Sequence, residues 1–133
     1  MSNLSLFLKK NKKQRPNVRY AATQSLCDEK GKPLEWEIKP ISSAEHDRIR
    51  EECGIGTEGS SFWGRYREKF LTACIVYPDL YDQELQDSYG VMSAEELLRA
   101  MVDDPKEFDA LYSFAYGAGD TDGIEKRIEE AKN

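Results

Sequence analysis

The sequence predicts a small single-domain protein of the α+β class that is mainly α, with about five to six short helices and an N-terminal β-hairpin. Its length of 133 residues suits one domain with one hydrophobic core. Leu34, Trp36 and Ile38 alternate with charged residues, which is the period-two pattern of a half-buried strand. From residue 42 onward, helix-capping residues and apolar residues at helical spacing recur between glycine and proline stops.

The chain is expected to divide into an arm and one domain. We predict that residues 1–17 form a flexible N-terminal arm and that residues 18–133 form a single globular domain. Within this domain the hairpin would occupy residues 18–40 and the helical body residues 42–131. The arm has few signals of regular structure apart from one apolar group, here named the arm cluster: Leu4, Leu6, Phe7 and Leu8.

The predicted hairpin consists of the runs Arg19–Cys27 and Leu34–Ile38, joined by the sequence DEKGKP. Gly31 in this connection tolerates a positive φ, which tight hairpin turns require. Because an isolated pair of strands is at best marginally stable in water, we expect the hairpin to pack against helices.

Capping residues mark three helix starts. Ser42 is followed three positions later by Glu45, and Ser93 by Glu96, which is the spacing of a capping box. Asp104 precedes a proline, as a cap does when proline occupies the first helical position. These signals predict helices that begin at 42, 93 and 104, and weaker ones predict a short helix near 82–88 and a charged helix from 121.

Residues 61–77 have the strongest amphipathic pattern, and we predict one helix over this range. Its apolar residues recur at helical spacing and are Phe62, Tyr66, Phe70, Ala73 and Tyr77. Pro78 would end the helix. We interpret the stripe as a face that packs in the core.

Charge is divided unevenly along the chain. Residues 1–40 hold nine basic and four acidic residues, a net charge of +5, and residues 41–133 hold ten and twenty-one, a net charge of −11. A basic run near the start could touch nucleic acid, and its members are Lys9, Lys10, Lys12, Lys13 and Arg15. The run lacks interleaved aromatic residues and the acidic remainder would repel phosphates, so we expect a solvated arm and no nucleic-acid partner.

Membrane insertion and secretion are not expected either. No apolar run approaches the ~20 residues that span a bilayer. The first residues place leucine and phenylalanine before the lysines, which is the reverse of the order in a signal peptide. We therefore expect the protein to stay in the cytoplasm and to have no membrane partner.

No catalytic, cofactor or metal site is expected. No two of the three cysteines have CxxC spacing, and we interpret them as free thiols: Cys27, Cys53 and Cys74. His46, the only histidine, is expected at a solvated surface position. Ser88, in the stretch QDSYGVMSAEEL, has no histidine near it in the sequence, whereas a nucleophilic serine needs a base within hydrogen-bond reach. We interpret this stretch as a helix that ends at Gly90 and a helix that begins at Ser93.

Two short motifs imitate ligand sites. The sequence GIGTEG, residues 54–59, fits the GxGxxG pattern of dinucleotide-binding loops, but it follows a helix rather than a strand and we interpret it as a helix stop. The sequence GDTDGIEK contains a fragment of a calcium loop. We interpret its polar residues as a helix cap at Asp120 or Thr121.

A resemblance covers about residues 4–103. The segments that carry it are LSLFLKKNK, DEKGKPLEWEIKPIS, Arg50–Cys53, LTACIVYPDLYDQELQDSYGVM and ELQDSYGVMSAEELLRAM. In this order they resemble the XkdN-like family of phage tail assembly chaperones, which is found in Bacillus phages and defective prophages.

The resemblance implies a non-enzymatic assembly factor without a cofactor, located in the host bacterial cytoplasm and absent from the mature virion. It implies that the chain binds the tape measure protein and assists tail tube assembly, with the tail tube protein as a further partner and with self-association open. Our candidate partner-binding residues are those of the arm cluster: Leu4, Leu6, Phe7 and Leu8. Apolar side chains at a chain end can become ordered on an apolar partner.

Three other readings remain open at this point. The arm cluster can instead pack on its own domain or on a second copy. The chain can be a protein-binding adaptor or regulatory module unrelated to tail assembly. It can also be a small hydrolase that uses Ser88 or a pair of carboxylates.

Overall fold

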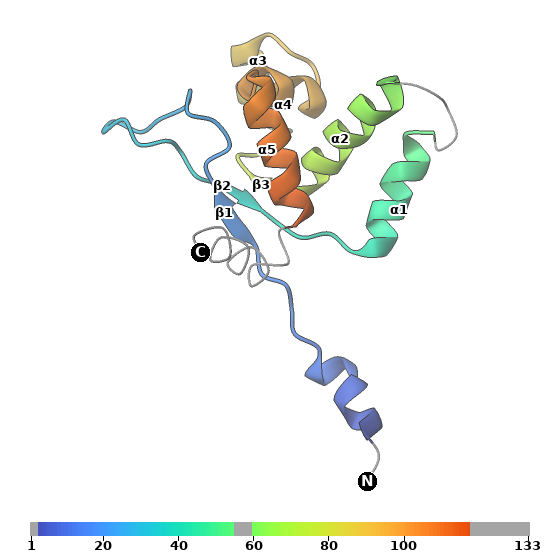
Figure 1. The fold of residues 1–133 in the computed structure, drawn as a ribbon. Helices are drawn as coiled ribbons and strands as arrows, with labels where there is room; N and C mark the ends of the chain where they lie inside the picture. The colour runs from blue at the N-terminus through green and yellow to red at the C-terminus, as the bar shows by residue number, and fades with distance from the viewer. Residues whose placement is uncertain (1–2, 55–59, 118–133) are drawn as a thin grey trace, which may run out of the picture.

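A computed structural model of the chain describes residues 3–54 and 60–117 (Figure 1). In this part of the chain, five α-helices and a three-stranded antiparallel sheet share one core. The elements in chain order are η1 (Asn3–Phe7), η2 (Lys9–Asn11), β1 (Val18–Tyr20), β2 (Trp36–Ile38), α1 (Ser43–Glu52), α2 (Ser60–Cys74), β3 (Ile75–Tyr77), α3 (Gln83–Tyr89), α4 (Ala94–Met101) and α5 (Pro105–Tyr116). The predicted fold class, a small α+β domain that is mainly α, is confirmed.

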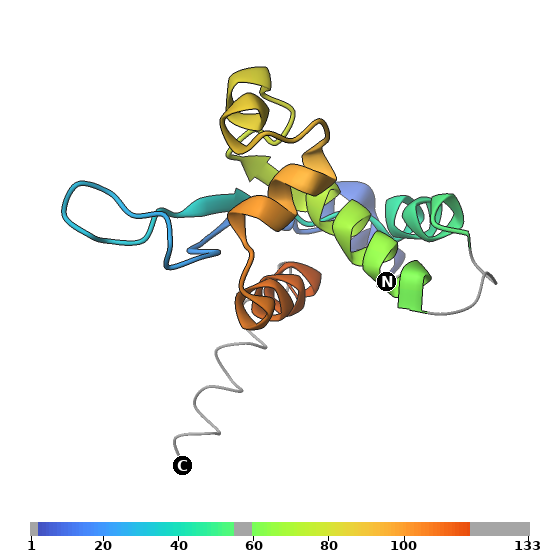
Figure 2. The ribbon, with the colours of Figure 1, turned by 90° about the horizontal axis from the view of Figure 1, so that it is seen from above.

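The sheet has the strand order β1-β2-β3, so the predicted hairpin forms its first two strands. Val18 pairs with Ile38 and Tyr20 with Trp36, which places these four side chains on the face that packs against the helices. The hairpin extends from the sheet away from the helices (Figures 1 and 2). The pairing is shorter than predicted, because the first run contributes only β1 and a single bridge near the tip.

The hairpin turn forms as its sequence predicts. Gly31 has a φ of +83°, a value that favours glycine. The Asp28 carboxylate accepts hydrogen bonds from the backbone N–H groups of Lys30 and Lys32 at 2.8 and 3.0 Å. The turn is therefore stabilised by its own side chain as well as by backbone bonds.

The helix predicted over 61–77 is present as α2, but only as far as Cys74, and its last three residues form a third strand that the sequence pattern does not predict. The helix ends at Cys74, and Ile75–Tyr77 forms β3 beside β2. Ile75 and Val76 are β-branched and favour a strand, and pairing with β2 takes precedence over the helical spacing that happens to continue to Tyr77. Val76 is an extra residue opposite β2, so the ladder has a β-bulge there.

The base of the hairpin is fixed to α5. Thr23 donates a hydrogen bond from its hydroxyl to one Glu107 carboxylate oxygen at 2.6 Å, and the backbone N–H of Gln24 donates to the other at 2.8 Å. The ring of Tyr20 stacks on Phe114 with ring centroids 4.2 Å apart. These contacts hold β1 against the helical layer.

The predicted helix caps at Ser42, Ser93 and Asp104 are confirmed. Their side-chain oxygens accept hydrogen bonds from the backbone N–H groups of Glu45, Glu96 and Lys106 at 3.1, 3.1 and 2.8 Å. Each bond joins the cap to a backbone N–H two or three residues later, as in other helix N-caps. The predicted turn between α3 and α4 is also present, because Gly90 has a left-handed φ of +68°. The expected terminal helix from 121, with its cap at Asp120 or Thr121, lies outside the described residues.

Helix α2 is the centre of the helical layer and contacts α1, α4 and α5. Its Leu71 packs with side chains of the other helices that are completely buried, namely Leu97, Leu98 and Leu111. Among the described residues no helix is long and apolar enough to cross a membrane. All three cysteines are free, with Cys53 and Cys74 buried and Cys27 exposed.

Replacing any one of the three capping residues, Ser42, Ser93 or Asp104, by alanine is expected to destabilise the fold. Each loss leaves a backbone N–H at the helix start unpaired and should cost about 0.5–2 kcal/mol. Urea denaturation measures this free energy. Ser113→Ala is the matched control, because this exposed serine lies inside α5 and caps nothing. An unchanged midpoint in all three capping variants would contradict the helix boundaries.

The thiols should differ in reactivity. Burial raises the pKa of the Cys74 thiol to about 12, whereas the thiolate is the form that reacts with alkylating reagents. At mildly alkaline pH we expect the folded chain to be labelled at Cys27 and Cys74 to react only after denaturation. Mass spectrometry of labelled peptides reads out both sites. Equal labelling rates at Cys27 and Cys74 in the folded chain would show that Cys74 is not buried.

Candidate partner-binding surfaces

The arm cluster lies at the surface. Exposed fractions are 69% for Leu4, 70% for Leu6, 83% for Phe7 and 46% for Leu8. Three of these residues belong to η1 and the fourth follows it directly, so the structure has helical turns where the sequence shows no signal for them. Figure 1 shows this part of the chain pointing away from the helices and the sheet. The partner-binding role of these residues remains a prediction.

The base of the arm is tied to the domain by two side chains. The Arg15 guanidinium donates a hydrogen bond to the backbone carbonyl of Ile41 at 2.7 Å. Asn17 donates from its amide to the Glu37 carboxylate at 3.0 Å. Residues 3–14 precede these anchors, so the arm cluster is presented from a fixed point on the domain.

A second surface lies between α1 and α5, which run on either side of α2 (Figure 1). We name it the aromatic groove. It consists of two open hollows of about 300 Å³ each, and His46 and Tyr116 line both. The rings of His46 and Tyr116 approach to 6.0 Å between centroids and so separate the two hollows.

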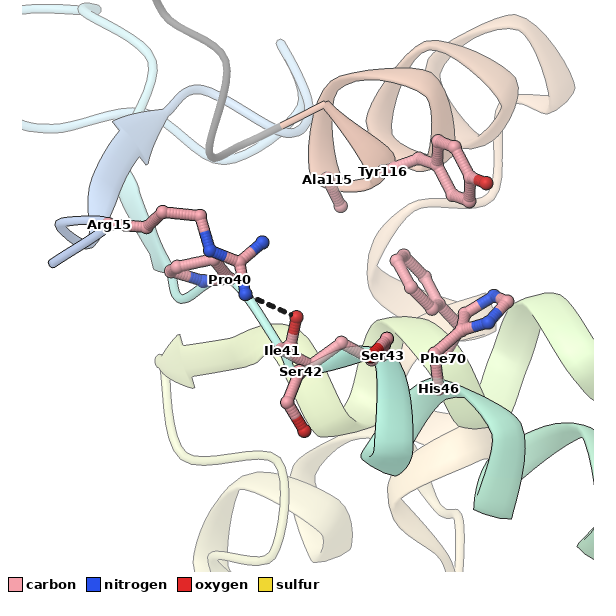
Figure 3. A pocket seen from close by; sticks show the side chains of 9 residues that line it. All are labelled: Arg15, Pro40, Ile41, Ser42, Ser43, His46, Phe70, Ala115 and Tyr116. Carbon is pink, nitrogen blue, oxygen red and sulfur yellow. Dashed lines mark hydrogen bonds between the residues drawn. The ribbon is translucent and has the colours of Figure 1, made fainter. Parts of the chain in front are cut away.

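Figure 3 shows the first hollow. Tyr116 from α5 and His46 from α1 point toward each other, and Phe70 from α2 lies beside both, with ring centroids 5.8 Å from His46 and 6.0 Å from Tyr116. Arg15 lies at the edge, with its guanidinium bonded to the Ile41 carbonyl. The second hollow begins on the other side of His46 and is lined by side chains of all three helices: Arg50, Phe62, Trp63, Tyr66 and Tyr112.

The floor of the groove is a set of aromatic rings in mutual contact. Tyr66 and Phe70 of α2 contact Tyr112 of α5 with ring centroids 6.1 and 5.5 Å apart. Edge-to-face pairs of this kind stabilise packing beyond the area that they bury. Two rings of the groove reach the solvent, because Trp63 is 48% and Tyr116 63% exposed.

A chain of hydrogen bonds crosses the floor. The Tyr112 hydroxyl donates to the Tyr66 oxygen at 3.3 Å, and the Tyr66 hydroxyl is bonded to Nε2 of His46. Burial, and next the bond from Tyr112, raise the pKa of the Tyr66 hydroxyl well above its usual value. Tyr66 therefore remains protonated at neutral pH, and its hydroxyl can donate a hydrogen bond to Nε2 of His46. The expected solvated position of His46 is wrong, because the side chain is only 22% exposed and packs on three aromatic rings.

The groove differs in charge from the rest of the molecule. Arg15 and Arg50 line it, and among the described residues that line either hollow there is no aspartate or glutamate. The chain as a whole has a net charge of −6. The carboxylate of Asp47, an exposed side chain, lies beside the groove, with one oxygen 4.0 Å from Nδ1 of His46. The hollows themselves thus combine aromatic rings with positive charge.

The sequence predicts only part of this groove. Tyr66 and Phe70 were interpreted as core residues, and both are buried, whereas Phe62 is half-buried. Tyr77, the last residue of the predicted stripe, lies in β3 and is 66% exposed, so that part of the interpretation is wrong. The sequence pattern places Tyr112 on the apolar face of its helix but does not predict the groove or the contribution of Tyr116, although the spacing of four residues places both tyrosines on one helix face.

The other candidates for chemistry lie elsewhere. Ser88 donates a hydrogen bond from its hydroxyl to the Leu85 carbonyl at 2.7 Å and lines neither hollow. Within residues 3–54 and 60–117, no group of three or more His, Cys, Asp or Glu residues could hold a metal ion.

Both the sequence and the fold are similar to those of known proteins. The family model described as phage XkdN-like tail assembly chaperone protein matches residues 4–132. The chain belongs to this family. The match covers nearly the whole chain, and it continues beyond residue 103, where the resemblance seen in the sequence ends.

This tail assembly chaperone also has a structural neighbour. The crystal structure of the protein YqbN, a structural genomics target, has 17% sequence identity, and the similarity covers 90% of this chain and 97% of that chain with a TM-score of 0.74. At this identity the likeness shows a shared fold. No curated protein matches the sequence.

Mutation can compare the contributions of Phe70 in the groove floor and of Tyr77 in β3 to the stability of the fold. In this tail assembly chaperone Phe70 is 3% exposed, so Phe70→Ala should cost ~3–5 kcal/mol of unfolding free energy. Tyr77→Ala removes a ring of comparable size that is mostly exposed, and should cost below about 1 kcal/mol. Chemical denaturation of both variants gives the comparison. Equal losses would mean that the two residues are buried to the same extent.

Proposed function

We propose that this tail assembly chaperone binds the tape measure protein of its phage through the arm cluster and thereby assists assembly of the tail tube. It acts by binding and not by catalysis. The observation that supports this most directly is the exposure of four neighbouring apolar side chains, Leu4, Leu6, Phe7 and Leu8, on an arm that points away from the domain.

The physical basis is the removal of apolar surface from water. Burial of each Å² of apolar surface contributes about 25 cal/mol, and Phe7, with an exposed fraction of 83%, has most of its ring available for this. The two lysines that follow, Lys9 and Lys10, can meet carboxylates of the partner at the edge of the contact. A client that exposes apolar segments before it is assembled would be covered in this way.

The family places the protein in tail assembly, and the remaining details belong to the proposal. The chaperone acts in the cytoplasm of the host bacterium and leaves the assembly before the virion is complete. Tail tube subunits are a further protein partner, whereas nucleic acid and membranes are not. Packing of the arm on a second copy of the chain is the competing use of the same side chains.

The test is co-expression with the tape measure candidate of the same phage. Leu6→Asp combined with Phe7→Asp places two charges in the arm cluster. We expect the soluble fraction of the tape measure protein to fall to the level seen without the chaperone, and co-purification to be lost. The melting temperature of the variant should stay unchanged, since both side chains are at the surface.

A matched control uses exposed apolar residues of the domain. Tyr81 and Met92 are 68% and 90% exposed, so Tyr81→Asp combined with Met92→Asp introduces the same charge away from the arm and should leave solubilisation intact. Full solubilisation by the arm variant would contradict the proposal. Deletion of residues 1–10 adds a second arm variant, and a large fall in its melting temperature would assign the arm to the core instead.

A further inference from the structure

We infer that the aromatic groove between α1 and α5 is a second docking site, which binds an amphipathic helix of a partner protein. This helix carries carboxylates along its polar edges. This surface is separate from the arm cluster. The inference rests on the shape of the groove, on the side chains that reach the solvent there, and on its charge.

The shape suits a helix. The walls are α1, with 10 residues, and α5, with 12, and at 1.5 Å per residue they are about 15 and 18 Å long, or three turns of helix. A helix laid between two others over a third packs its side-chain ridges into the space between them. Each hollow, at about 300 Å³, is at the lower limit of the roughly 300–1,000 Å³ of ligand pockets, so it suits single side chains.

The residues at the surface of the groove are those that dominate binding energy at protein interfaces. Trp63 and Tyr116 present partly exposed rings, and Arg15 and Arg50 lie at the two hollows. Tryptophan, tyrosine and arginine are enriched among interface residues whose truncation costs most affinity. Because the rings of the floor are held by packing and by the Tyr112–Tyr66–His46 hydrogen bonds, the surface is formed before the partner arrives.

Charge decides which partner fits. Both arginines are positive, and within residues 3–54 and 60–117 no acidic residue lines the hollows. The arm of a second copy, with its basic run, would meet repulsion there, whereas a helix flanked by carboxylates would pair with the guanidinium groups. The occupant is therefore an acidic amphipathic segment of another protein and not the arm of this one.

Two designed peptides test this. Both have about twenty residues, beyond the length of roughly 12–15 residues below which isolated helices are marginal in water. They share a leucine stripe at i, i+3, i+4 and i+7, but one carries glutamates and the other lysines beside the stripe. Titration into the full chain is followed by tryptophan fluorescence. We expect the glutamate peptide to shift the emission of Trp63 to shorter wavelength, because its indole is half-exposed and becomes covered, whereas Trp36 is already buried.

Charge reversal provides the specific readout. Arg50→Glu should weaken the glutamate peptide about tenfold and strengthen the lysine peptide. Arg48→Glu is the matched control, since this exposed arginine lies on the same helix but lines a different hollow, and it should change either affinity less than about twofold. Trp63→Phe should abolish the fluorescence signal, and the arm variant Leu6→Asp with Phe7→Asp should bind the glutamate peptide normally.

Other outcomes would overturn the inference. Equal binding of both peptides in every variant would indicate unspecific apolar contact. Absence of any Trp63 response to the glutamate peptide would mean that the groove is not a helix site. Self-association of the chain that Arg50→Glu strengthens would assign the groove to the basic arm of a second copy. Because the arm variant is tested separately, failure here is distinguishable from failure of the proposed arm function.

Discussion

The structure depends on the direct passage of α2 into β3. Cys74 is the last residue of the helix and Ile75 the first of the strand, so no loop separates the helical layer from the sheet. Helix α2 contacts α1, α4 and α5, and β3 pairs with β2. A shift of α2 must therefore move the sheet as well. The arm that precedes β1 and the groove over α2 are thus held in a fixed position relative to each other.

Helix α2 has one side that is covered by ion pairs and cation–π contacts, and another side on which aromatic rings line an open groove. On the covered side, the ring of Phe108 in α5 lies beneath the guanidinium groups of Arg99 and Arg67, at 3.8 and 4.9 Å from the ring centroid. These arginines also pair with Glu68 and Asp109. Cation–π contacts strengthen as the cation is removed from water, and the Arg67 side chain is only 17% exposed. The groove forms between α1 and α5, and Arg67 reaches its edge, because its guanidinium also lies 5.5 and 5.9 Å from the ring centroids of Trp63 and Tyr112.

Local signals predicted much of the fold, and contacts between distant residues account for the rest. The cap at Ser42 and the turn at Gly90 could be predicted because a cap or turn involves atoms within a few residues. The strand β3 could not, because its partner Ile38 lies 37 positions earlier in the chain. Likewise, the exposed arm cluster follows from a run of neighbouring residues, whereas the groove needs His46 beside Tyr116 and so requires the folded chain.

The strands are only three residues long, and the bulge at Val76 interrupts one of the two outer strands. An outer strand offers its free backbone groups to any other extended chain, and long flat edges promote fibril growth. Edges of three residues, one of them distorted, present too few hydrogen-bonding groups in register to template such growth. The sheet of this chaperone therefore does not act as a seed for the polymerisation of other extended chains.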